Sequence, residues 1–417
     1  MQSPVPAPLG GAKSVVVIGG GAVGGLSAYQ LQKAGYQVTL LEARAWGNGS
    51  SSRSAACIRG QFSTPSTVRA MVYCERFYAE WPFGDPPITQ NGYLFLKDPR
   101  VDLRAIARTV EMQRRAGLPV ELLDRNQIEA KFPYLELTGI QAATWCPNDG
   151  FLSPNRVYQD AIDGAMALGA QVYQNAEVVD VLFDHAHKPI AVRCADGRVF
   201  KGEVFVNAGG VWAPRISHMF GGYILDIKPR RRYLYFLEGL NGSSGEFMTP
   251  EDFGRMPMTI LPSGAYWRPE STKSGQLMFA WLHPTEPIPP RFDEQDIIEP
   301  GFRRGDGYGE GVRKEILNYF PDVQRMGNIF SVTSGFYEDT PDHNPFIGID
   351  PWVPNLVHAA GFSGHGLMQA PFAAAVVSAL VSVGKEISQV CLPGVGEVDI
   401  DAFAVNRQYQ SSESMVI

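Results

Sequence analysis

The chain has 417 residues, with 43 acidic against 36 basic side chains and a formal net charge of −7. This acidic balance argues against a nucleic-acid partner, and the length predicts two domains rather than one core. Its five cysteines are widely spaced without a C-x-x-C pair, so neither a disulfide framework nor a metal site is expected, and the reducing cytoplasm is the expected location. The longest apolar stretch, near 370–383, is too short to span a membrane and is expected in a core.

The first predicted elements are a strand, a glycine-rich turn and a helix. Residues 15–18 are apolar and mostly β-branched, which favours a strand buried on both faces. The G-x-G-x-x-G pattern that follows consists of Gly19, Gly21 and Gly24. Such glycines let backbone N–H groups approach a pyrophosphate at a helix N-terminus. A second strand over 36–41 ends in Glu42, whose carboxylate can accept hydrogen bonds from an adenosine ribose. The segment predicts a dinucleotide site rather than a chance glycine-rich turn.

Further along the chain, segments typical of an antiparallel sheet alternate with segments of the nucleotide-binding type. A proline-rich break at 82–87 marks a domain crossing. The predicted strand 203–207 runs into Ala-Gly-Gly, which places another glycine-lined turn beside the nucleotide. From 223 to 290, aromatic and β-branched runs alternate with Gly, Pro and Ser turns, as is typical of an antiparallel sheet.

The last predicted nucleotide segment is AAGFSGHGLMQAP at 359–371, which precedes an apolar helix over 370–383. FAD needs close backbone approach at both its pyrophosphate and its ring, whereas a nicotinamide cofactor has no particular need for a second glycine loop. The dipole at the helix N-terminus can stabilise negative charge that builds on a reduced flavin ring. The alternative is a loop that only caps a buried helix. Together the two glycine motifs favour FAD.

Seven segments spread over nearly the whole chain carry a family resemblance. They are GGGAVGG (19–25), EAR (42–44), SSSRSAACIRGQFSTP (50–65), NGYLFL (91–96), FVNAGGVWAP (205–214), YEDTPDHNPFIG (337–348) and GFSGHGLMQAP (361–371). In this order they resemble the D-amino acid oxidase superfamily of FAD-dependent oxidoreductases. The resemblance is closest to the branch that holds the sarcosine oxidase β subunits and the dimethylglycine dehydrogenase-like proteins.

The resemblance implies an α/β fold with a discontinuous Rossmann-like FAD domain of the glutathione reductase type and an antiparallel-sheet α+β substrate domain. The expected boundaries are 14–85, 146–222 and 330–400 for the FAD domain, 86–145 and 223–329 for the substrate domain, and 1–13 for a flexible leader. The residues expected to contact FAD are Gly19, Gly21, Ala22, Val23, Gly24, Glu42, Ala43, Arg44, Ser51, Ser52, Arg53, Ser54, Ala56, Val178, Ala208, Gly209, Trp212, Gly361, Phe362, Ser363, Gly364, His365, Gly366 and Met368. Residues 50–54, four serines with Arg53, form what is called here the Ser/Arg run. The alternative for this run is a flexible serine-rich loop.

Five residues are candidates for the chemistry. Arg59 matches an arginine that binds the substrate carboxylate in sarcosine oxidases, where a planar fork pairs bidentately; a surface salt bridge is its alternative. The resemblance places His365 next to the flavin, where it can tune the local charge, although a histidine that only packs is the alternative. Tyr266 and Trp267 would form aromatic walls for an amine, or else pack in a core. Tyr337 stands where related oxidases have a carboxylate-binding arginine.

Several positions depart from the family pattern. Gly335 stands where monomeric sarcosine oxidases attach FAD through a cysteine, so FAD is expected to bind non-covalently. Residues 276–280 align with the strand that carries an oxygen-activating lysine, and they contain none. Met368 replaces a lysine that contacts the substrate carboxylate. The electron acceptor is therefore either O2 or an electron carrier.

The expected reaction is hydride transfer from the carbon of a C–N bond to flavin N5, which gives an imine. The expected substrate is an N-methyl amino acid, a cyclic imino acid or a similar small amine. Two alternatives stay open. One is a 2-hydroxy acid dehydrogenase on the same fold, with His365 as the base. The other is a flavoprotein that serves as an assembly or electron-transfer partner without a small-molecule substrate. A homo-oligomer also stays open.

Overall fold

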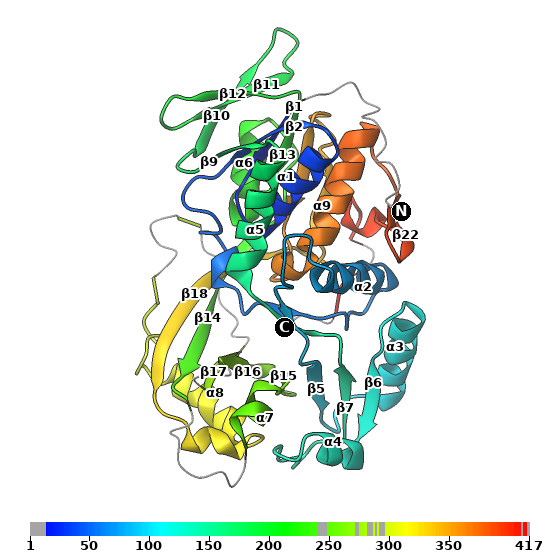
Figure 1. Cartoon of the computed structure of the whole chain (residues 1–417), viewed down its shortest axis with the longest axis vertical. Helices are drawn as coiled ribbons and strands as arrows, with labels where there is room; N and C mark the ends of the chain where they lie inside the picture. Colours follow the sequence, from blue (N-terminus) through cyan, green and yellow to red (C-terminus); the bar gives the residue numbers. More distant parts are fainter. Residues whose placement is uncertain are drawn as a thin grey trace.

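The computed structural model describes residues 14–239, 248–271, 275–281, 287, 290–291, 297–409 and 412–414. The predicted leader, residues 1–13, lies outside the described residues. Figure 1 shows two parts, with a sheet flanked by helices in the upper half of the view and a larger sheet with its own helices in the lower half. Segments from both ends of the chain meet in the upper part, so the chain returns to it after building most of the lower part.

The upper part contains a six-stranded, mostly parallel sheet. In spatial order its strands are β19 (Phe346–Ile349), β20 (Leu356–Ala360), β13 (Val204–Asn207), β1 (Ser14–Ile18), β2 (Gln37–Leu41) and β9 (Gln171–Tyr173). β1 pairs in parallel with β2 and with β13, and only β19 runs antiparallel to its neighbour. This arrangement confirms the α/β fold class. The domain boundaries stay a prediction.

The strand β1 is buried on both faces, as its composition predicts. Val15 and Val17 pack into the main core, and Val16 and Ile18 pack into a separate cluster on the opposite face. The helices of the main core are α1 (Ala22–Lys33), α2 (Pro65–Ala79), α5 (Pro154–Ala167) and α9 (Gly366–Val383), and α6 (Ala213–Met219) covers the other face. A three-stranded antiparallel sheet lies beyond α6, made of β10 (Val178–Phe183), β11 (Pro189–Cys194) and β12 (Val199–Lys201).

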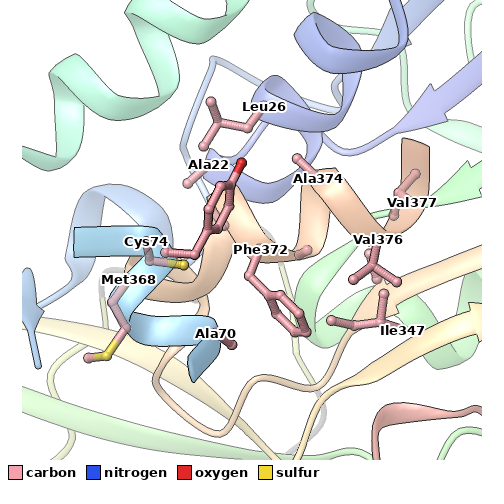
Figure 2. Packing of buried hydrophobic residues seen from close by; sticks show 14 of the residues in the cluster. Ala22, Leu26, Ala70, Cys74, Ile347, Met368, Phe372, Ala374, Val376 and Val377 are labelled. Atoms are coloured by element: carbon pink, nitrogen blue, oxygen red, sulfur yellow. The ribbon is translucent and has the colours of Figure 1, made fainter. Parts of the chain in front are cut away.

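The apolar helix α9 lies in the centre of the main core. It packs against α1 and α2, and Figure 2 shows Phe372 and Val376 of α9 among side chains of both neighbours and of β19. In length and composition α9 also meets the criteria for a membrane-spanning helix, but most of it is buried inside the protein. The packing agrees with the sequence-based expectation that this stretch belongs to a core.

The lower part is an eight-stranded sheet. Its order is β18 (Ile329–Asp339), β14 (Lys228–Leu237), β17 (Gln276–Trp281), β16 (Ala265–Ser271), β15 (Met258–Ile260), β5 (Tyr93–Lys97), β7 (Ala142–Cys146) and β6 (Glu121–Asp124). All neighbours are antiparallel except β15 and β5. The helices of this part are α3 (Leu103–Arg115), α4 (Arg125–Lys131), α7 (Pro250–Gly254) and α8 (Tyr308–Leu317).

The two faces of this sheet have different surroundings. One face packs with α4, α7 and α8 around Trp267, Tyr235 and Phe279. The other face carries a smaller apolar cluster that includes Tyr266 and Cys57. Because side chains alternate along a strand, neighbouring residues of one strand enter different environments.

Short elements complete the structure. They are β3 (Cys57–Ile58), β4 (Ile88–Thr89), β8 (Gly150–Leu152), β21 (Gln389–Leu392), β22 (Gly396–Asp399) and the 3-10 helices η1 (Ser51–Arg53), η2 (Gly210–Trp212), η4 (Pro321–Arg325) and η5 (Asp401–Phe403). The strands β3, β8 and β4 form a small antiparallel sheet. This small sheet fixes the segment that begins with the Ser/Arg run.

Candidate functional site

A long cavity runs from the turn after β1 to the inner face of the eight-stranded sheet. The free space between its wall atoms, including space that is open to solvent, is about 1490 Å³. Its lining residues come from β1 and α1, the Ser/Arg run, the turn after β13, β14, β16, β18 and the glycine loop before α9. The predicted cofactor residues that line it are Gly19, Gly21, Ala22, Val23, Glu42, Ala43, Ser51, Arg53, Ser54, Val178, Ala208, Gly209, Trp212, Phe362, Gly364 and Gly366.

The first glycine turn has no room for side chains. A Cβ on Gly24 would lie 1.8 Å from the carbonyl oxygen of Gly19, and a Cβ on Gly19 would lie 2.3 Å from the carbonyl oxygen of Ala208. Gly19 also has φ +115°, which favours glycine. Gly24 does not line the cavity; its role is to let α1 pack directly on the turn. The N–H of Ala22, at the start of α1, donates to Ser51 Oγ at 3.1 Å and so ties the turn to the Ser/Arg run.

Glu42 stands at the end of β2 with both carboxylate oxygens toward the turn. Its Oε2 accepts a hydrogen bond from the N–H of Gly20 at 2.7 Å, and its Oε1 accepts one from the N–H of Arg44 at 2.9 Å. Burial raises the pKa of Glu42, and these backbone hydrogen bonds oppose the shift. Arg44 itself lies outside the cavity lining. The acidic residue is therefore held beside the turn by two backbone hydrogen bonds and lines the cavity there.

The turn after β13 is fixed by a buried network that sequence reasoning missed. The Nε2 atom of His358 lies 2.8 Å from Asp350 Oδ2, and its Nδ1 atom lies 3.1 Å from Asn207 Nδ2. Asn207 Oδ1 in turn accepts the N–H of Gly209 at 3.2 Å. His358 therefore donates from Nε2 and accepts at Nδ1. The three side chains hold Ala208 and Gly209 against the cavity from behind. In the sequence, the only signal for this network is a polar residue at the end of a buried strand.

The Ser/Arg run enters the cavity only in part. Ser51, Arg53 and Ser54 line it, whereas Ser52 is exposed and Ala56 is buried behind it with φ +58°. The Arg53 guanidinium bonds to the Gly49 carbonyl at 3.1 Å. The predictions that Ser52 and Ala56 contact the cofactor are therefore not supported: Ser52 points to solvent from the 3-10 helix η1, and Ala56 lies beyond η1 in the buried segment before β3.

The glycine loop before α9 also has two faces. Phe362, Gly364 and Gly366 line the cavity, and a Cβ on Gly364 would lie 2.4 Å from the ring of Tyr337. Gly361 does not line the cavity: a Cβ on it would lie 2.7 Å from Thr340 Cγ2, and its N–H donates to Glu338 Oε2 at 2.6 Å. The residues of the loop that lie outside the lining are Gly361, Ser363, His365 and Met368.

Met368 belongs to the main core rather than to the site. Figure 2 shows it beside α2, close to Cys74 and Ala70. Ser363 is fully buried, and its hydroxyl lies 3.2 Å from that of Thr340. These placements correct the predicted roles, because the phase of the helix directs position 368 inward.

His365 and Arg59 form a buried contact next to the cavity. Arg59 Nη2 lies 3.3 Å from His365 Nε2, and the guanidinium lies 4.0 Å above the ring of Phe62. Burial lowers the pKa of His365, and the Arg59 charge lowers it further. Arg59 is 1% exposed, so the alternative of a surface salt bridge is wrong. Neither residue is part of the cavity lining.

Tyr266 and Trp267 are neighbours with opposite environments. Tyr266 lines the cavity from β16, and burial raises its pKa well above the ordinary value, so its hydroxyl keeps its proton. Trp267 is fully buried on the other face, stacked on Phe320 with ring centroids 5.9 Å apart. The prediction that Trp267 forms a wall of the site is wrong. Because side chains alternate along a strand, only one of the two neighbours, Tyr266, faces the cavity.

Arg232 is a cavity residue that is not among the candidates named from the sequence. It lines the same end of the cavity as Tyr266 and Tyr337, with its guanidinium 5.2 Å from the Tyr337 ring and 3.9 Å from Asp339. Burial raises the pKa of Tyr337 to about 12, so this phenol is also a hydrogen-bond donor at neutral pH. The signal that could have found Arg232 is strand alternation: Arg232 stands two residues before Leu234, so both side chains face the same side of β14, and both line the cavity.

Other chemistry is not supported by the described ranges. No group of three or more His, Cys, Asp or Glu side chains among these residues could hold a metal ion. Cys57 is buried, and burial raises the pKa of its thiol to about 11, so it is not an activated nucleophile. At Gly335 a Cβ would lie 3.0 Å from the Cβ of Arg53. A larger residue at this position would crowd Arg53, and non-covalent binding of FAD stays a prediction.

The turn, the acidic residue after β2 and the second glycine loop define a flavin-adenine-dinucleotide oxidoreductase: the glycine positions form a cradle that side chains would fill, and the cavity extends past it to a substrate wall. The family model described as FAD dependent oxidoreductase, DAO, matches residues 14–380, and the chain belongs to this family. It is an FAD-dependent enzyme.

Curated relatives and solved structures extend this result. The chain is 27% identical to FAD-dependent oxidoreductase domain-containing protein 1 of Bos taurus, over 95% of this chain and 84% of that protein. It is 26% identical to the monomeric sarcosine oxidase of Bacillus sp. (strain B-0618), over 94% and 95%. The structure superposes on L-proline dehydrogenase from P. horikoshii with a TM-score of 0.79 and 27% identity, over 94% of this chain and 96% of that one. The predicted resemblance is confirmed.

Proposed function

We propose that this enzyme oxidises the C–N bond of a small amino or imino acid, such as an N-methyl amino acid or a cyclic imino acid, to an imine. The observation that carries the proposal is the end wall of the cavity, which Arg232, Tyr266 and Tyr337 line together, with the Arg232 guanidinium 5.2 Å from the Tyr337 ring. Bound FAD would supply the hydride acceptor, and water then hydrolyses the released imine. The names of two relatives, a monomeric sarcosine oxidase and an L-proline dehydrogenase, support this substrate class.

The wall suits both ends of an amino acid. A guanidinium pairs with a carboxylate in a planar, bidentate geometry. The faces of Tyr266 and Tyr337 can hold the cationic amine before it loses its proton, and their hydroxyls, which keep their protons, can donate to the substrate. In this arrangement Arg232 takes the carboxylate, and Arg59 contributes positive charge from behind the wall. The residues orient the donor carbon and exclude water, which is the larger part of catalysis for such a reaction.

The buried histidine disfavours oxidation of a 2-hydroxy acid. That reaction needs a base for the hydroxyl proton, and His365 is the sequence-based candidate. Since a guanidinium can only donate, the Nε2 atom of His365 must accept from Arg59 at 3.3 Å. The lone pair that a base would use is therefore occupied, and His365 lies outside the cavity lining. Hydride transfer from an amine needs no dedicated base of this kind.

The electron acceptor is part of the proposal. The strand β17 presents Leu277, Met278 and Phe279 where related oxidases are expected to have an oxygen-activating lysine. We therefore infer that an electron carrier, rather than O2, takes the electrons in the second half-reaction.

The test is anaerobic mixing of the purified holoenzyme with panels of N-methyl amino acids, prolines, D-amino acids and 2-hydroxy acids, followed by the loss of flavin absorbance. The proposal expects bleaching by secondary amino acids and none by hydroxy acids. Bleaching by hydroxy acids alone would overturn it, and a flavin that no compound reduces would favour an assembly or electron-transfer partner. Repeating the active case in air and with a dye acceptor distinguishes oxidase from dehydrogenase.

A further inference from the structure

Two carboxyl groups lie fully inside the protein, directly behind the segment that carries Arg59. Glu75 belongs to α2 and is 5% exposed, and Asp149 stands in the turn before β8 and is 0% exposed. No Lys, Arg or His among the described residues forms a salt bridge with either one. Two neighbouring buried acids without a cation cannot both be charged at moderate cost. The pair therefore requires an explanation.

Asp149 holds the segment that carries Arg59 through one backbone N–H and one side chain of that segment. Its Oδ1 accepts the N–H of Gly60 at 2.8 Å, and its Oδ2 accepts Nε2 of Gln61 at 3.0 Å. Its backbone carbonyl accepts the N–H of Gly92 at 2.9 Å, next to β5. Both side-chain oxygens are thus acceptors, which is the arrangement of an ionised carboxylate.

Glu75 has the opposite character. Its buried Oε1 atom accepts no hydrogen bond, and a Cβ on Gly60 would lie 2.8 Å from it. Burial raises the pKa of both acids, and the hydrogen bond between them raises that of Glu75 while it lowers that of Asp149. Because both carboxylate oxygens of Asp149 already accept hydrogen bonds and Glu75 Oε1 accepts none, Glu75 is the acid of the pair that carries the proton. The titratable groups that face the pair are Cys74, Cys146 and Tyr93, each with its own pKa raised by burial and thus uncharged at neutral pH.

The segment held in this way connects both halves of the site. Gln61 Nε2 also donates to the carbonyl of Tyr93 at 3.0 Å, at the start of β5 in the substrate sheet. Arg59 reaches His365, the residue that precedes the first turn of α9. A displacement of this segment would therefore move the end of the glycine loop relative to the sheet.

We propose that Glu75 and Asp149 share a single proton, and that in this state they act as positioning residues for the Arg59–Gln61 segment. No group transfer is involved: one proton stays between two carboxyl oxygens. The kinetic consequence rests on the proposed function, because it concerns binding of a carboxylate substrate. The structural consequence does not, since the proton can be detected in the holoenzyme without any substrate.

The decisive variant is Glu75→Gln, which places a permanent donor where the protonated acid stands. The control is Glu80→Gln, an exposed glutamate that ends the same helix and pairs with Arg76. A raised folded-state pKa means that the stabilising, protonated form persists at low pH and is lost as the pH rises through that pKa. Wild-type holoenzyme should therefore lose thermal stability between pH 5 and 9 relative to Glu75→Gln, and Glu80→Gln should follow the wild type throughout.

Two further measurements complete the test. At pH 8, where Glu338 is mostly ionised, the infrared band of a protonated carboxylic acid should be present in the wild type and lost in Glu75→Gln. With an active amino acid substrate, KM of the wild type should rise roughly tenfold at high pH with little change in kcat, and Glu75→Gln should remove this rise. Asp149→Asn, which cannot accept from both Gly60 and Gln61, should have the high KM at every pH.

The outcomes separate this inference from the proposed function. If Glu75→Gln changes stability equally at all pH values and leaves the infrared band, the shared proton is refuted. If the band and the stability behave as expected but KM is insensitive, the positioning role is refuted and the shared proton stands. If no amino acid reduces the flavin, the proposed function fails, while the stability and infrared measurements still decide on the pair.

Discussion

The Nε2 atom of His365 accepts a hydrogen bond from Arg59, with 3.3 Å between the two nitrogens and both side chains buried. His365 therefore carries its proton on Nδ1 and stays uncharged. Since burial and the Arg59 charge lower its pKa, flavin reduction should show no loss from this group as the pH falls from 7.5 to 6. Stopped-flow reduction rates across this range provide the measurement. A fall centred near pH 6.5 that disappears in His365→Gln would contradict the finding.

Removing the guanidinium of the end wall should weaken substrate binding. We expect Arg232→Gln to lower kcat/KM for carboxylate substrates by roughly 10- to 100-fold, because a hydrogen bond to a charged group contributes about 1.5–3 kcal/mol. Arg230→Gln is the matched control: it shares the strand and the Asp339 partner, at 3.0 Å, but does not line the cavity. Steady-state kinetics should show a near-normal control. Equal losses in both variants would mean that the shared ion pair, not substrate contact, sets the effect.

The neighbours Tyr266 and Trp267 should behave in opposite ways. Tyr266→Phe should change the KM or the rate of flavin reduction several-fold while leaving the melting temperature nearly unchanged, because only a cavity hydroxyl is lost. Trp267→Phe should reduce the free energy of unfolding by about 1–3 kcal/mol through loss of packing on Phe320, with kinetics preserved. Thermal unfolding and steady-state kinetics of both variants test this contrast. A kinetic defect confined to Trp267→Phe would reverse the assignment of the two faces.

The close contact between the first turn and α1 predicts a loss of cofactor. In Gly24→Ala the new Cβ would meet the Gly19 carbonyl oxygen at 1.8 Å, so the turn must open and the affinity for FAD should fall roughly tenfold or more. Gly311→Ala in α8, where nothing lies within 4 Å, should retain the flavin and gain about 0.5–1 kcal/mol of stability. Titration of the apoproteins with FAD measures both. Unchanged affinity in Gly24→Ala would show that the turn can relax.

The buried Glu338 should make stability depend on pH. Burial raises its pKa from 4.5 to about 7, so the protonated form stabilises the fold at low pH and this contribution is lost as the pH rises through 7. The difference amounts to about 3 kcal/mol, since one pKa unit corresponds to about 1.4 kcal/mol. Between pH 5 and 8, Glu338→Gln should therefore gain stability relative to the wild type in chemical unfolding. If the stabilities of the wild type and Glu338→Gln change in parallel over this pH range, Glu338 does not titrate within it.

The sequence predicted those parts of the site that a local pattern encodes. The turn from Gly19 to Gly24 and the acid at Glu42 follow from spacing alone, because each is fixed by the strand before it. Tyr266 and Trp267 were both predicted to form walls of the site, with core packing as the alternative, because alternation separates neighbours without showing which one faces the cavity. Met368 was misplaced for the same reason in a helix, where one residue shifts the direction by about 100°.

What the sequence did not reveal depends on contacts between distant segments. Arg232 enters the cavity because β14 pairs with β18 in a register that only the folded sheet defines. The contact of Glu75 with Asp149 joins residues far apart in the chain, and Asn207, His358 and Asp350 come together across neighbouring strands. Each of these residues is an ordinary polar side chain in its own segment.

The interleaved order of the six-stranded sheet has a consequence for biosynthesis. β20 and α9 lie far downstream of β1 in the chain, so a growing chain that has not yet reached α9 lacks one wall of the cofactor cradle. Loading of the vitamin-derived cofactor must then follow synthesis of α9, and until that point the apolar surfaces of β1 and α1 have no packing partner in this helix.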